Sequence, residues 1–266
     1  MSGVGDVTVD TSALAERLAA VRARIAATGR APDDIVVVAV TKGFGAGAVE
    51  AASAVGLVDV GENYAQELAE KANAVTSAAF PGGAVPGGAV PGGAAPGGAV
   101  SGGAVPGGGQ RWHFLGRVQR NKVRSIAATV HLWQGVDRVA AGEEIARRAP
   151  GARVLVQVRI DGGDGGPHGQ AARNGCPPDG VPALVERLDG LGLDVRGLMA
   201  VGPPGPPELA RPGFRAVSAL ADRLGLVERS MGMTEDLGVA VEEGSTMVRV
   251  GRGLFGARPV APSMRR

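Results

Sequence analysis

The chain has 266 residues, of which 44% are hydrophobic and only 3% aromatic, and its mean hydropathy is +0.10. This composition is typical of a globular protein with an aliphatic core, and a chain of this length can form one large domain or two small ones. The 28 basic and 26 acidic residues leave a net charge of +2 without a basic cluster, so nucleic acid is not an expected partner.

The sequence lacks the signals of a secreted or membrane protein. Cys176 is the single cysteine, which excludes an internal disulfide framework. The first ten residues lack the basic start and apolar run of a signal peptide, and no stretch approaches the ~20 apolar residues of a membrane span. We therefore expect a cytoplasmic protein without a membrane partner.

The predicted elements begin with an amphipathic helix over 12–28, followed by the strand IVVVAVT (35–41). This strand is β-branched without alternation, as is typical of a parallel strand buried on both faces. Strand-like and helix-like segments alternate from there. The further expected strands are 58–60, 112–115, 131–134, 153–160, 195–200, 228–231 and 247–250. The expected helices between them are 46–55, 62–75, 119–129, 137–149, 179–191, 207–225 and 234–243.

Eight successive βα-type strands predict one domain over 1–266, a single (β/α)8 TIM barrel with an N-terminal helix. An open doubly wound sheet is the alternative. Residues 81–110 repeat Pro-Gly-Gly-Ala-Val units without a charge, which predicts a flexible, disordered insert. Because the insert connects a helix to the following strand, we expect it on the barrel face opposite the active site.

Two glycine-rich stretches imitate a dinucleotide fingerprint. GRGLFG (251–256) matches G-x-G-x-x-G, but too few residues follow it to form the helix and second βα unit that this motif requires. GFGAGA (43–48) matches G-x-G-x-x-A between the first strand and a helix. A dinucleotide site using Gly43, Gly45 and Ala48 therefore remains an open alternative.

Lys42 directly follows the most apolar strand, which predicts a position at the C-terminal mouth of the barrel, where catalytic residues of this fold gather. A partly desolvated lysine there can attack an aldehyde and form a Schiff base. The alternative is a solvated lysine at the end of a strand.

Six sequence blocks around this lysine resemble the YggS/PROSC family of pyridoxal phosphate homeostasis proteins. The blocks are VAVTKG (38–43), VGENYAQE (60–67), WHFLGRVQRNK (112–122), RGLMAV (196–201), SMGMTED (230–236) and EEGSTMVRVGRGLFG (242–256). They occur in the order of the family, and the resemblance covers about residue 12 to 257 without the insert.

The resemblance implies a barrel of the alanine racemase type in which Lys42 holds pyridoxal 5′-phosphate (PLP) as a Schiff base. Asn63 matches a family residue near the cofactor ring. The matches to phosphate contacts are Ser230, the backbone of Gly232, Gly251 and the backbone of Arg252. Helix capping and turn formation are the alternative roles of Asn63, Ser230 and Gly232.

Arg249 matches the family residue that faces the pyridine nitrogen. An arginine donates hydrogen bonds without giving up its proton, so it would leave this nitrogen unprotonated and make the ring a weaker electron sink. The alternative role of Arg249 is a surface ion pair with Glu242 or Glu243.

The resemblance implies a PLP-binding protein that buffers or delivers the cofactor and is not an enzyme. The alternative is a PLP-dependent amino-acid racemase, but such an enzyme needs a tyrosine base from an additional C-terminal domain. The sequence ends soon after its last predicted strand, and Tyr64 is its single tyrosine. We expect His113 and His131, which lie in predicted strands, to be core residues. His168 lies in a predicted loop on the active-site face, where we expect a solvated position, and a position at the mouth of the barrel is the alternative.

The resemblance also bears on partners and on one loop of the barrel. Apo forms of PLP-dependent enzymes are candidate recipients, and we expect a monomer or weak dimer. No cluster with metal-ligand spacing is present in the sequence.

The loop after the fifth strand departs from the family, since it has Arg173 at a lysine position and extra glycines at 162–166.

Overall fold

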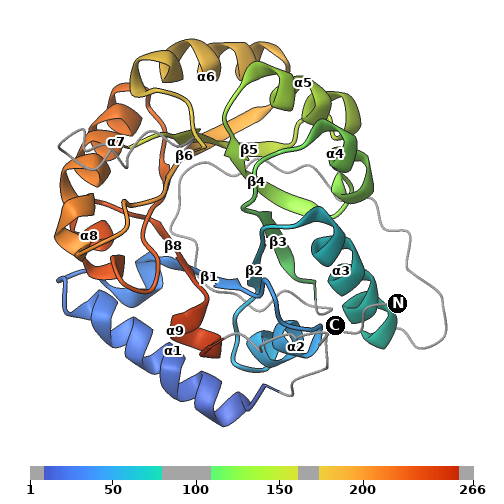
Figure 1. The fold of residues 1–266 in the computed structure, drawn as a ribbon, viewed down its shortest axis with the longest axis vertical. Coiled ribbons are helices and arrows are strands. Elements are labelled where there is room, and N and C mark those ends of the chain that lie inside the picture. Colours follow the sequence, from blue (N-terminus) through green and yellow to red (C-terminus); the bar gives the residue numbers. More distant parts are fainter. Residues whose placement is uncertain (1–8, 80–108, 161–173, 258–266) are drawn as a thin grey trace, which may run out of the picture.

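The computed structural model describes residues 9–79, 109–160 and 174–257, in which eight parallel strands form a closed barrel (Figure 1). The strands are β1 (Val36–Val40), β2 (Asp59–Glu62), β3 (Arg111–Phe114), β4 (Val130–Val136), β5 (Arg153–Val158), β6 (Asp194–Ala200), β7 (Glu228–Ser230) and β8 (Met247–Val250). They pair in sequence order, and β1 closes the ring by pairing with β8 from Val36–Met247 to Ala39–Val250. The predicted barrel is confirmed and the open doubly wound sheet is wrong.

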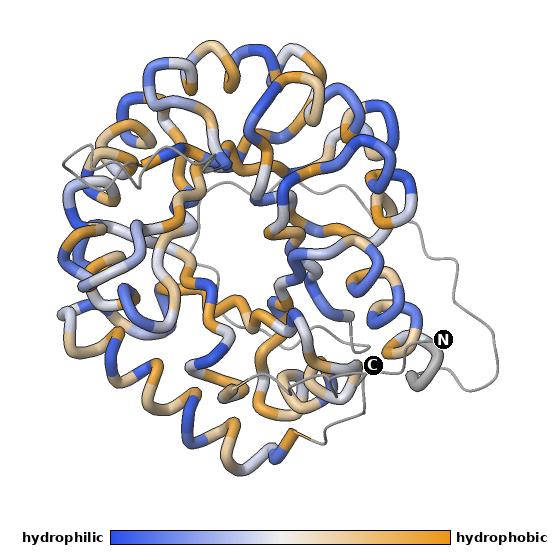
Figure 2. Tube along the Cα trace, viewed as in Figure 1, coloured by the Kyte–Doolittle hydropathy of each residue, from blue (hydrophilic) through white to orange (hydrophobic). Residues whose placement is uncertain are grey.

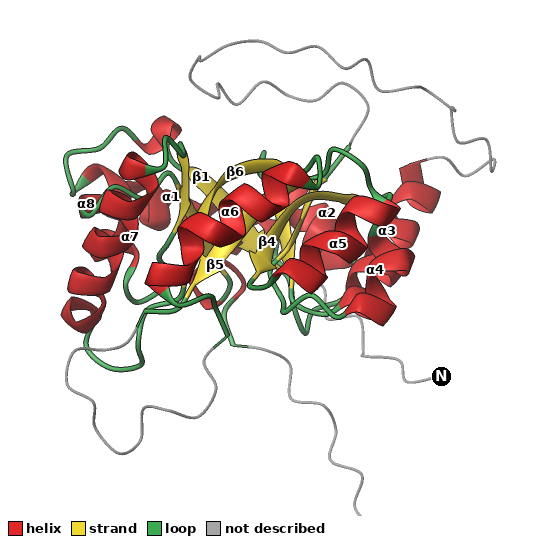
Figure 3. Ribbon diagram, turned by 90° about the horizontal axis from the view of Figure 1, so that it is seen from above, coloured by secondary structure: helices red, strands yellow, loops and turns green. Residues whose placement is uncertain are grey.

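Helices surround this ring of strands (Figure 3). They are α1 (Thr11–Ala26), α2 (Gly47–Ala54), α3 (Ala65–Ala79), α4 (Arg120–Ile126), α5 (Val139–Arg148), α6 (Val181–Gly190), α7 (Arg211–Arg223), α8 (Leu237–Glu242) and α9 (Arg252–Phe255). Short 3-10 turns occur at Pro32–Asp34, Pro178–Gly180 and Pro207–Ala210. In the described part of the chain, no helix has both the length and the apolar character to cross a membrane.

The first helix shows how the sequence directs these elements. The carboxylate of Asp10 accepts hydrogen bonds from the backbone N–H groups of Ser12 and Ala13 at 2.9 and 3.3 Å, which caps the start of α1. The apolar face of α1, with Leu14 and Ile25 fully buried, packs on the part of the core that β1 and β8 contribute to. The helix thereby covers the seam where the barrel closes.

The barrel has an aliphatic layer outside its strands and a mixed interior. Figure 2 shows hydrophobic segments along much of the strand ring and hydrophilic ones on outward turns of the helices. The interior aliphatic cluster consists of Val38, Leu132, Leu155, Met199 and Met247. Buried polar side chains also come from the strands, and among them are His113, Gln134, Ser230 and Arg249.

Two of the differences from the sequence predictions lie next to the cavity. The helix expected over 62–75 begins only at Ala65, because Glu62 still belongs to β2, where it pairs with Phe114 of β3. A short helix, α9, forms inside the stretch 251–256, for which no helix was expected. The insert over 81–110 lies, except for its last two residues, outside the described residues, as do His168, Arg173 and the glycines at 162–166.

Candidate functional site

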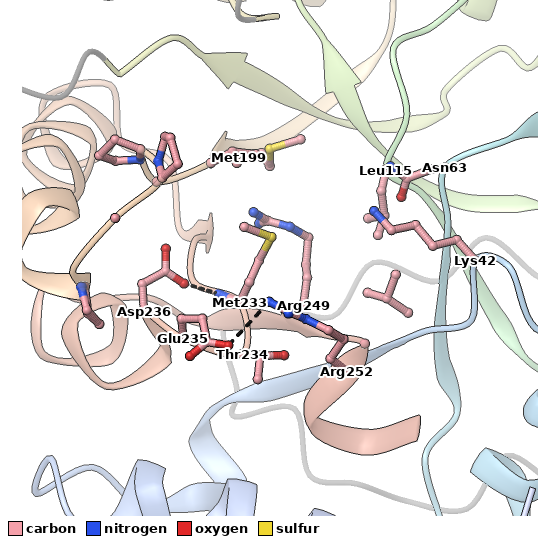
Figure 4. Close-up of a pocket in the computed structure, with 18 of the residues that line it drawn as sticks. Lys42, Asn63, Leu115, Met199, Met233, Thr234, Glu235, Asp236, Arg249 and Arg252 are labelled. Carbon is pink, nitrogen blue, oxygen red and sulfur yellow. Dashed lines mark hydrogen bonds and ion pairs between the residues drawn. The ribbon is translucent and has the colours of Figure 1, made fainter. Parts of the chain in front are cut away.

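A cavity of about 720 Å³ opens where the strands end, on the face of the barrel where the sequence placed the site (Figure 4). Its lining comes from the ends of β1, β6 and β8 and from the segments that follow β1, β2, β3, β6, β7 and β8. These residues are Val40, Lys42, Phe44, Asn63, Leu115, Met199, Val201–Gly205, Pro207, Met233–Asp236, Arg249, Gly251, Arg252 and Gly256. This volume is in the range of small-molecule and cofactor sites.

Lys42 lies in a tight turn directly after β1, which ends at Val40. The backbone N–H of Phe44 donates to the carbonyl oxygen of Thr41 at 3.0 Å and closes the turn. Gly43 has a φ of 78°, a left-handed conformation that favours glycine. The turn leaves Lys42 half-buried in the cavity wall, so its predicted position at the mouth of the barrel agrees with the structure.

A buried ion-pair network from α3 supports this turn. The ammonium of Lys71 lies 2.5 Å from Glu62 Oε1, 2.9 Å from the carbonyl oxygen of Thr41 and 3.1 Å from Glu67 Oε2. Glu62 Oε1 also accepts a 2.6 Å bond from the Thr41 hydroxyl, and Glu67 Oε2 accepts the Gly43 N–H at 3.0 Å. Burial raises the pKa of Glu62 above its usual range, although the charge of Lys71 opposes this shift. Sequence reasoning did not find Lys71; its spacing of four residues from Glu67 on a helix is the signal that was present.

Arg249 is the buried cation of the cavity, with 4% of its surface exposed. Its Nη1 donates to the carbonyl oxygen and the hydroxyl of Ser230 at 2.6 and 2.7 Å, and its Nη2 donates to the carbonyl oxygen of Ala200 at 2.8 Å. Burial lowers the pKa of Arg249 to about 10, while the charge of Asp236 opposes this shift, so the guanidinium stays protonated at neutral pH.

The alternative of a surface ion pair for Arg249 is wrong, because the side chain points inward and its expected partners are engaged elsewhere. Glu242 and Glu243 pair instead with Arg211, at 2.7 and 3.0 Å, and Glu243 also pairs with Arg215 at 2.8 Å.

Two loops complete the cavity on the side of β7 and β8. The loop after β7 contributes Met233–Asp236, and the Asp236 carboxylate accepts the Met233 N–H at 2.6 Å. The loop after β8 contributes Gly251 and Arg252. The Gly253 N–H donates to the Thr234 hydroxyl at 3.1 Å and links the two loops. Figure 4 shows Glu235 and Asp236 on one side of the cavity and Lys42 and Asn63 on the other.

The structure brings together five of the seven predicted site residues along the cavity wall: Lys42, Asn63, Arg249, Gly251 and Arg252. Ser230 and Gly232 are outside the set of lining residues. Ser230 is fully buried within β7, and its hydroxyl bonds Gln134 and Arg249. From the same stretch of sequence it is instead Met233–Asp236 that reaches the cavity. Sequence reasoning missed this because the strand stops at Ser230 and the chain then turns.

The other sequence candidates have clear positions. His113 is 1% exposed and bonds Asp59 and Gln134, which confirms it as a satisfied core residue, whereas His131 is only half-buried. The structure does not support the dinucleotide alternative at residues 43–48. This motif binds dinucleotides on an open sheet, whereas the sheet here is a closed barrel, and the Gly43 N–H already donates to the Glu67 carboxylate. Within the described residues, no group of three or more His, Cys, Asp or Glu side chains is arranged to hold a metal ion.

Comparison with known proteins gives a consistent assignment. The family model of the alanine racemase N-terminal domain matches residues 9–259. The pyridoxal phosphate homeostasis protein of Pseudomonas aeruginosa is 34% identical over 259 residues, which are 93% of this chain and 96% of that protein. The chain belongs to the family of pyridoxal phosphate homeostasis proteins. The homologue from Deinococcus radiodurans carries the same name and is 33% identical over 90% of this chain and 97% of its own.

A solved member of this family shares the fold over its whole length. PipY of Synechococcus elongatus, solved with PLP bound, matches with a TM-score of 0.68 and 27% identity over 91% of this chain and all of its own. The family resemblance seen in the sequence blocks is therefore confirmed, and it extends across the whole barrel.

Proposed function

We propose that this protein binds PLP in the cavity through a covalent bond to Lys42 and holds it for storage or delivery. The observation that carries the proposal is that Lys42, a half-buried residue, and the buried Arg249 line one cavity. The PLP-bound relative and the homologues named for PLP homeostasis support the same cofactor.

The residues present fit this cofactor. Arg249 has five guanidinium N–H groups, three of which donate to described residues. No acceptor among the described residues takes the other two N–H groups. Arg249 therefore retains two donors for an acceptor of the ligand, such as a ring nitrogen. Gly251 and the linked loops after β7 and β8 are where barrels of this kind hold phosphate, and we propose that the backbone of Arg252 contributes there.

We further propose that the bound cofactor is held without turnover. PLP supplies an electron sink for carbanions in enzymes, and its strength depends on protonation of the ring nitrogen. Arg249 would donate a hydrogen bond to that nitrogen while keeping its own proton, and this would weaken the sink. Neither histidine nor tyrosine is among the cavity residues that the structure describes, and the Asp236 carboxylate already accepts the Met233 N–H. Candidate recipients of the cofactor are apo forms of PLP-dependent enzymes.

Borohydride reduction of the PLP-loaded protein tests the proposal, because the chain has only three lysines, Lys42, Lys71 and Lys122. We expect a visible chromophore and, after reduction and digestion, a pyridoxyl label on the Lys42 peptide. Lys42→Ala should remove both, whereas Lys122→Ala, at an exposed lysine, should keep both. Label confined to Lys71 or Lys122, or a Lys42→Ala protein with unchanged chromophore, would refute the site.

Two further measurements address storage against turnover. Incubation of the loaded protein with an apo PLP-dependent enzyme should restore that enzyme's activity. Racemisation of a free amino acid that persists through purification and disappears in Lys42→Ala would favour the enzyme alternative.

A further inference from the structure

An unbroken chain of hydrogen bonds crosses the barrel interior from Asp59 on β2 to Arg249 on β8. Asp59 Oδ1 lies 2.9 Å from His113 Nε2, and His113 Nδ1 lies 2.8 Å from Gln134 Nε2. Gln134 Oε1 accepts the Ser230 hydroxyl at 2.6 Å, and Ser230 Oγ accepts Arg249 Nη1 at 2.7 Å. All of these residues are at most 8% exposed, so water does not compete for their bonds.

The two ends of this chain fix the direction of every bond between them. Arg249 can only donate and an ionised Asp59 can only accept. The Ser230 hydroxyl, having accepted from Arg249, donates to Gln134, whose amide then donates to His113 Nδ1. His113 is thereby assigned the tautomer with its proton on Nε2, which donates to Asp59. Arg111 Nη2 holds the other carboxylate oxygen of Asp59 at 2.6 Å.

At the cavity end, the chain limits how the guanidinium can rotate. Nη1 donates both of its N–H groups to Ser230, and Nη2 donates one of its two to the carbonyl oxygen of Ala200. The Nε–H and the second Nη2–H of Arg249 remain for a ligand. Rotation of the guanidinium would break its hydrogen bond to the Ser230 hydroxyl. The hydrogen-bond chain from Ser230 to Asp59 would then lack its donor at the cavity end. A buried polar chain of this kind is costly when it is only partly satisfied.

We propose that Asp59, His113, Gln134 and Ser230 are positioning residues, which hold Arg249 in one orientation toward the ring of bound PLP. This inference rests on the proposed function. It assigns the Ser230 hydroxyl to Arg249 rather than to the phosphate contact that the family resemblance implies.

Gln134→Met tests the hydrogen-bond chain at its central residue. Gln134 does not contact Arg249 through this chain directly, because Ser230 lies between them. We expect a folded protein whose PLP affinity falls by roughly threefold to tenfold, equivalent to about 0.7–1.4 kcal/mol. The absorbance maximum of its bound cofactor should shift in the same direction as that of Arg249→Gln. Ser230→Ala removes a single oxygen from the chain, and we expect it to fold and to shift the spectrum in the same way.

His131→Gln is the matched control, because the His131 ring lies 6.0 Å from the His113 ring but takes no part in the chain. Its spectrum and PLP affinity should equal those of the wild type at neutral pH. A purely structural role for the chain predicts lower stability in the Gln134 and Ser230 variants with an unchanged cofactor spectrum, and this result would overturn the inference.

NMR of the ¹⁵N-labelled apoprotein tests the orientation without the cofactor. In the wild type, slow rotation should give separate Nη signals for Arg249, and these should merge in Gln134→Met. Merged signals in the wild type would overturn the positioning role. Failure of the wild type to bind PLP would overturn the proposed function and the role toward the cofactor, whereas wild-type binding with unshifted variants overturns the positioning role alone.

Discussion

The ammonium group of Lys71 donates a 2.9 Å hydrogen bond to the carbonyl oxygen of Thr41, the residue that precedes Lys42. The same ammonium pairs with Glu62 and Glu67, and both it and Glu62 are buried. The helix α3 therefore holds the backbone from which Lys42 projects. Lys71 itself is outside the set of residues that line the cavity, whereas Lys42 is one of them.

Lys71→Met should lower the free energy of unfolding by about 3–5 kcal/mol, because Glu62 would keep a buried charge without its partner. Urea unfolding followed by circular dichroism at pH 7 measures this loss. Glu62→Gln in the same chain should restore part of it, since the neutral amide removes the unpaired charge. Lys122→Met, at an exposed position, should change stability by less than about 0.5 kcal/mol. Equal stability of the wild type and Lys71→Met would show that the network contributes nothing.

Gly116→Ala should displace Asn63, which lines the cavity. A Cβ atom at Gly116 would lie 2.0 Å from the carbonyl oxygen of Asn63, so the segments after β2 and β3 would have to separate. We expect a loss of about 1–3 kcal/mol in unfolding free energy and weaker PLP binding by titration. Gly238→Ala in α8 is the matched control, because nothing lies within 4 Å of its added Cβ, and it should stabilise the protein by about 0.5–1 kcal/mol. Similar stabilities for the two variants would contradict the close approach.

The sequence is sufficient to predict the barrel and the position of Lys42, because both depend on local patterns. Strands buried on both faces are continuous apolar runs, and a lysine directly after such a run lies at the end of the barrel. Arg249 could be placed in the same site as Lys42 only through the family resemblance.

The interior chain could not be predicted from the sequence, because its members come from five strands that closure alone brings together. Ser230 illustrates the difficulty. Met233–Asp236, which follow it in the sequence after two further residues, line the cavity, but strand alternation and the early end of β7 direct the Ser230 hydroxyl to Gln134, 96 residues away in sequence. The sequence placed the start of α3 at residue 62, three residues too early, because glutamate is common in helices. The buried ion pair of Glu62 with Lys71 forms only in the folded barrel and could not be foreseen.

Stability should fall between pH 6.5 and 4 partly through His131. Burial and the neighbouring His113 lower the pKa of His131 to about 4, from an ordinary value of 6.5, and Arg153 Nη1 lies 3.3 Å from its Nε2. Above pH 6.5 the residue is neutral in both states. As the pH falls toward 4, the unfolded chain takes up a proton that the folded protein does not, so unfolding is favoured.

His131→Gln should therefore lose less stability than the wild type between pH 7 and pH 4.5, as measured by urea unfolding at both values. NMR titration of the wild type should give a His131 midpoint near pH 4. A midpoint near the ordinary value of 6.5 would contradict the prediction.

We propose that residues 1–266 form one domain and that the insert over 81–110 is dispensable for it. The helix before the insert and the strand after it, α3 and β3, belong to the same barrel. Replacing 81–108 by a six-residue Gly-Ser linker should preserve PLP binding. It should change stability by no more than about 1.1 kcal/mol, the loop-closure difference between the ~31 residues that now connect α3 to β3 and the ~9 that would remain. Loss of PLP binding in a folded deletion variant would show that the insert contributes to the site.

Arg24 of α1 should strengthen PLP binding from outside the cavity. Its Nη1 and Nη2 donate to the carbonyl oxygens of Thr234 and Glu235 at 2.6 and 3.2 Å, and both of these residues line the cavity. Arg24→Ala frees this loop, and we expect PLP affinity to fall by roughly two- to fivefold, equivalent to about 0.4–1 kcal/mol. Arg24→Lys should recover only part of the affinity, because a single ammonium lacks the fork that spans two carbonyls.

Arg22→Ala provides the control for this experiment, since Arg22 is exposed on the same helix and, within the described part of the chain, makes no hydrogen bond or ion pair with residues 233–236. Its PLP affinity, measured in the same fluorescence titration, should equal that of the wild type. The unfolding free energy of both alanine variants should stay within about 1 kcal/mol of the wild type, because the arginines are exposed. Equal PLP affinity of Arg24→Ala and Arg22→Ala would show that α1 covers the barrel seam without influencing the cofactor site.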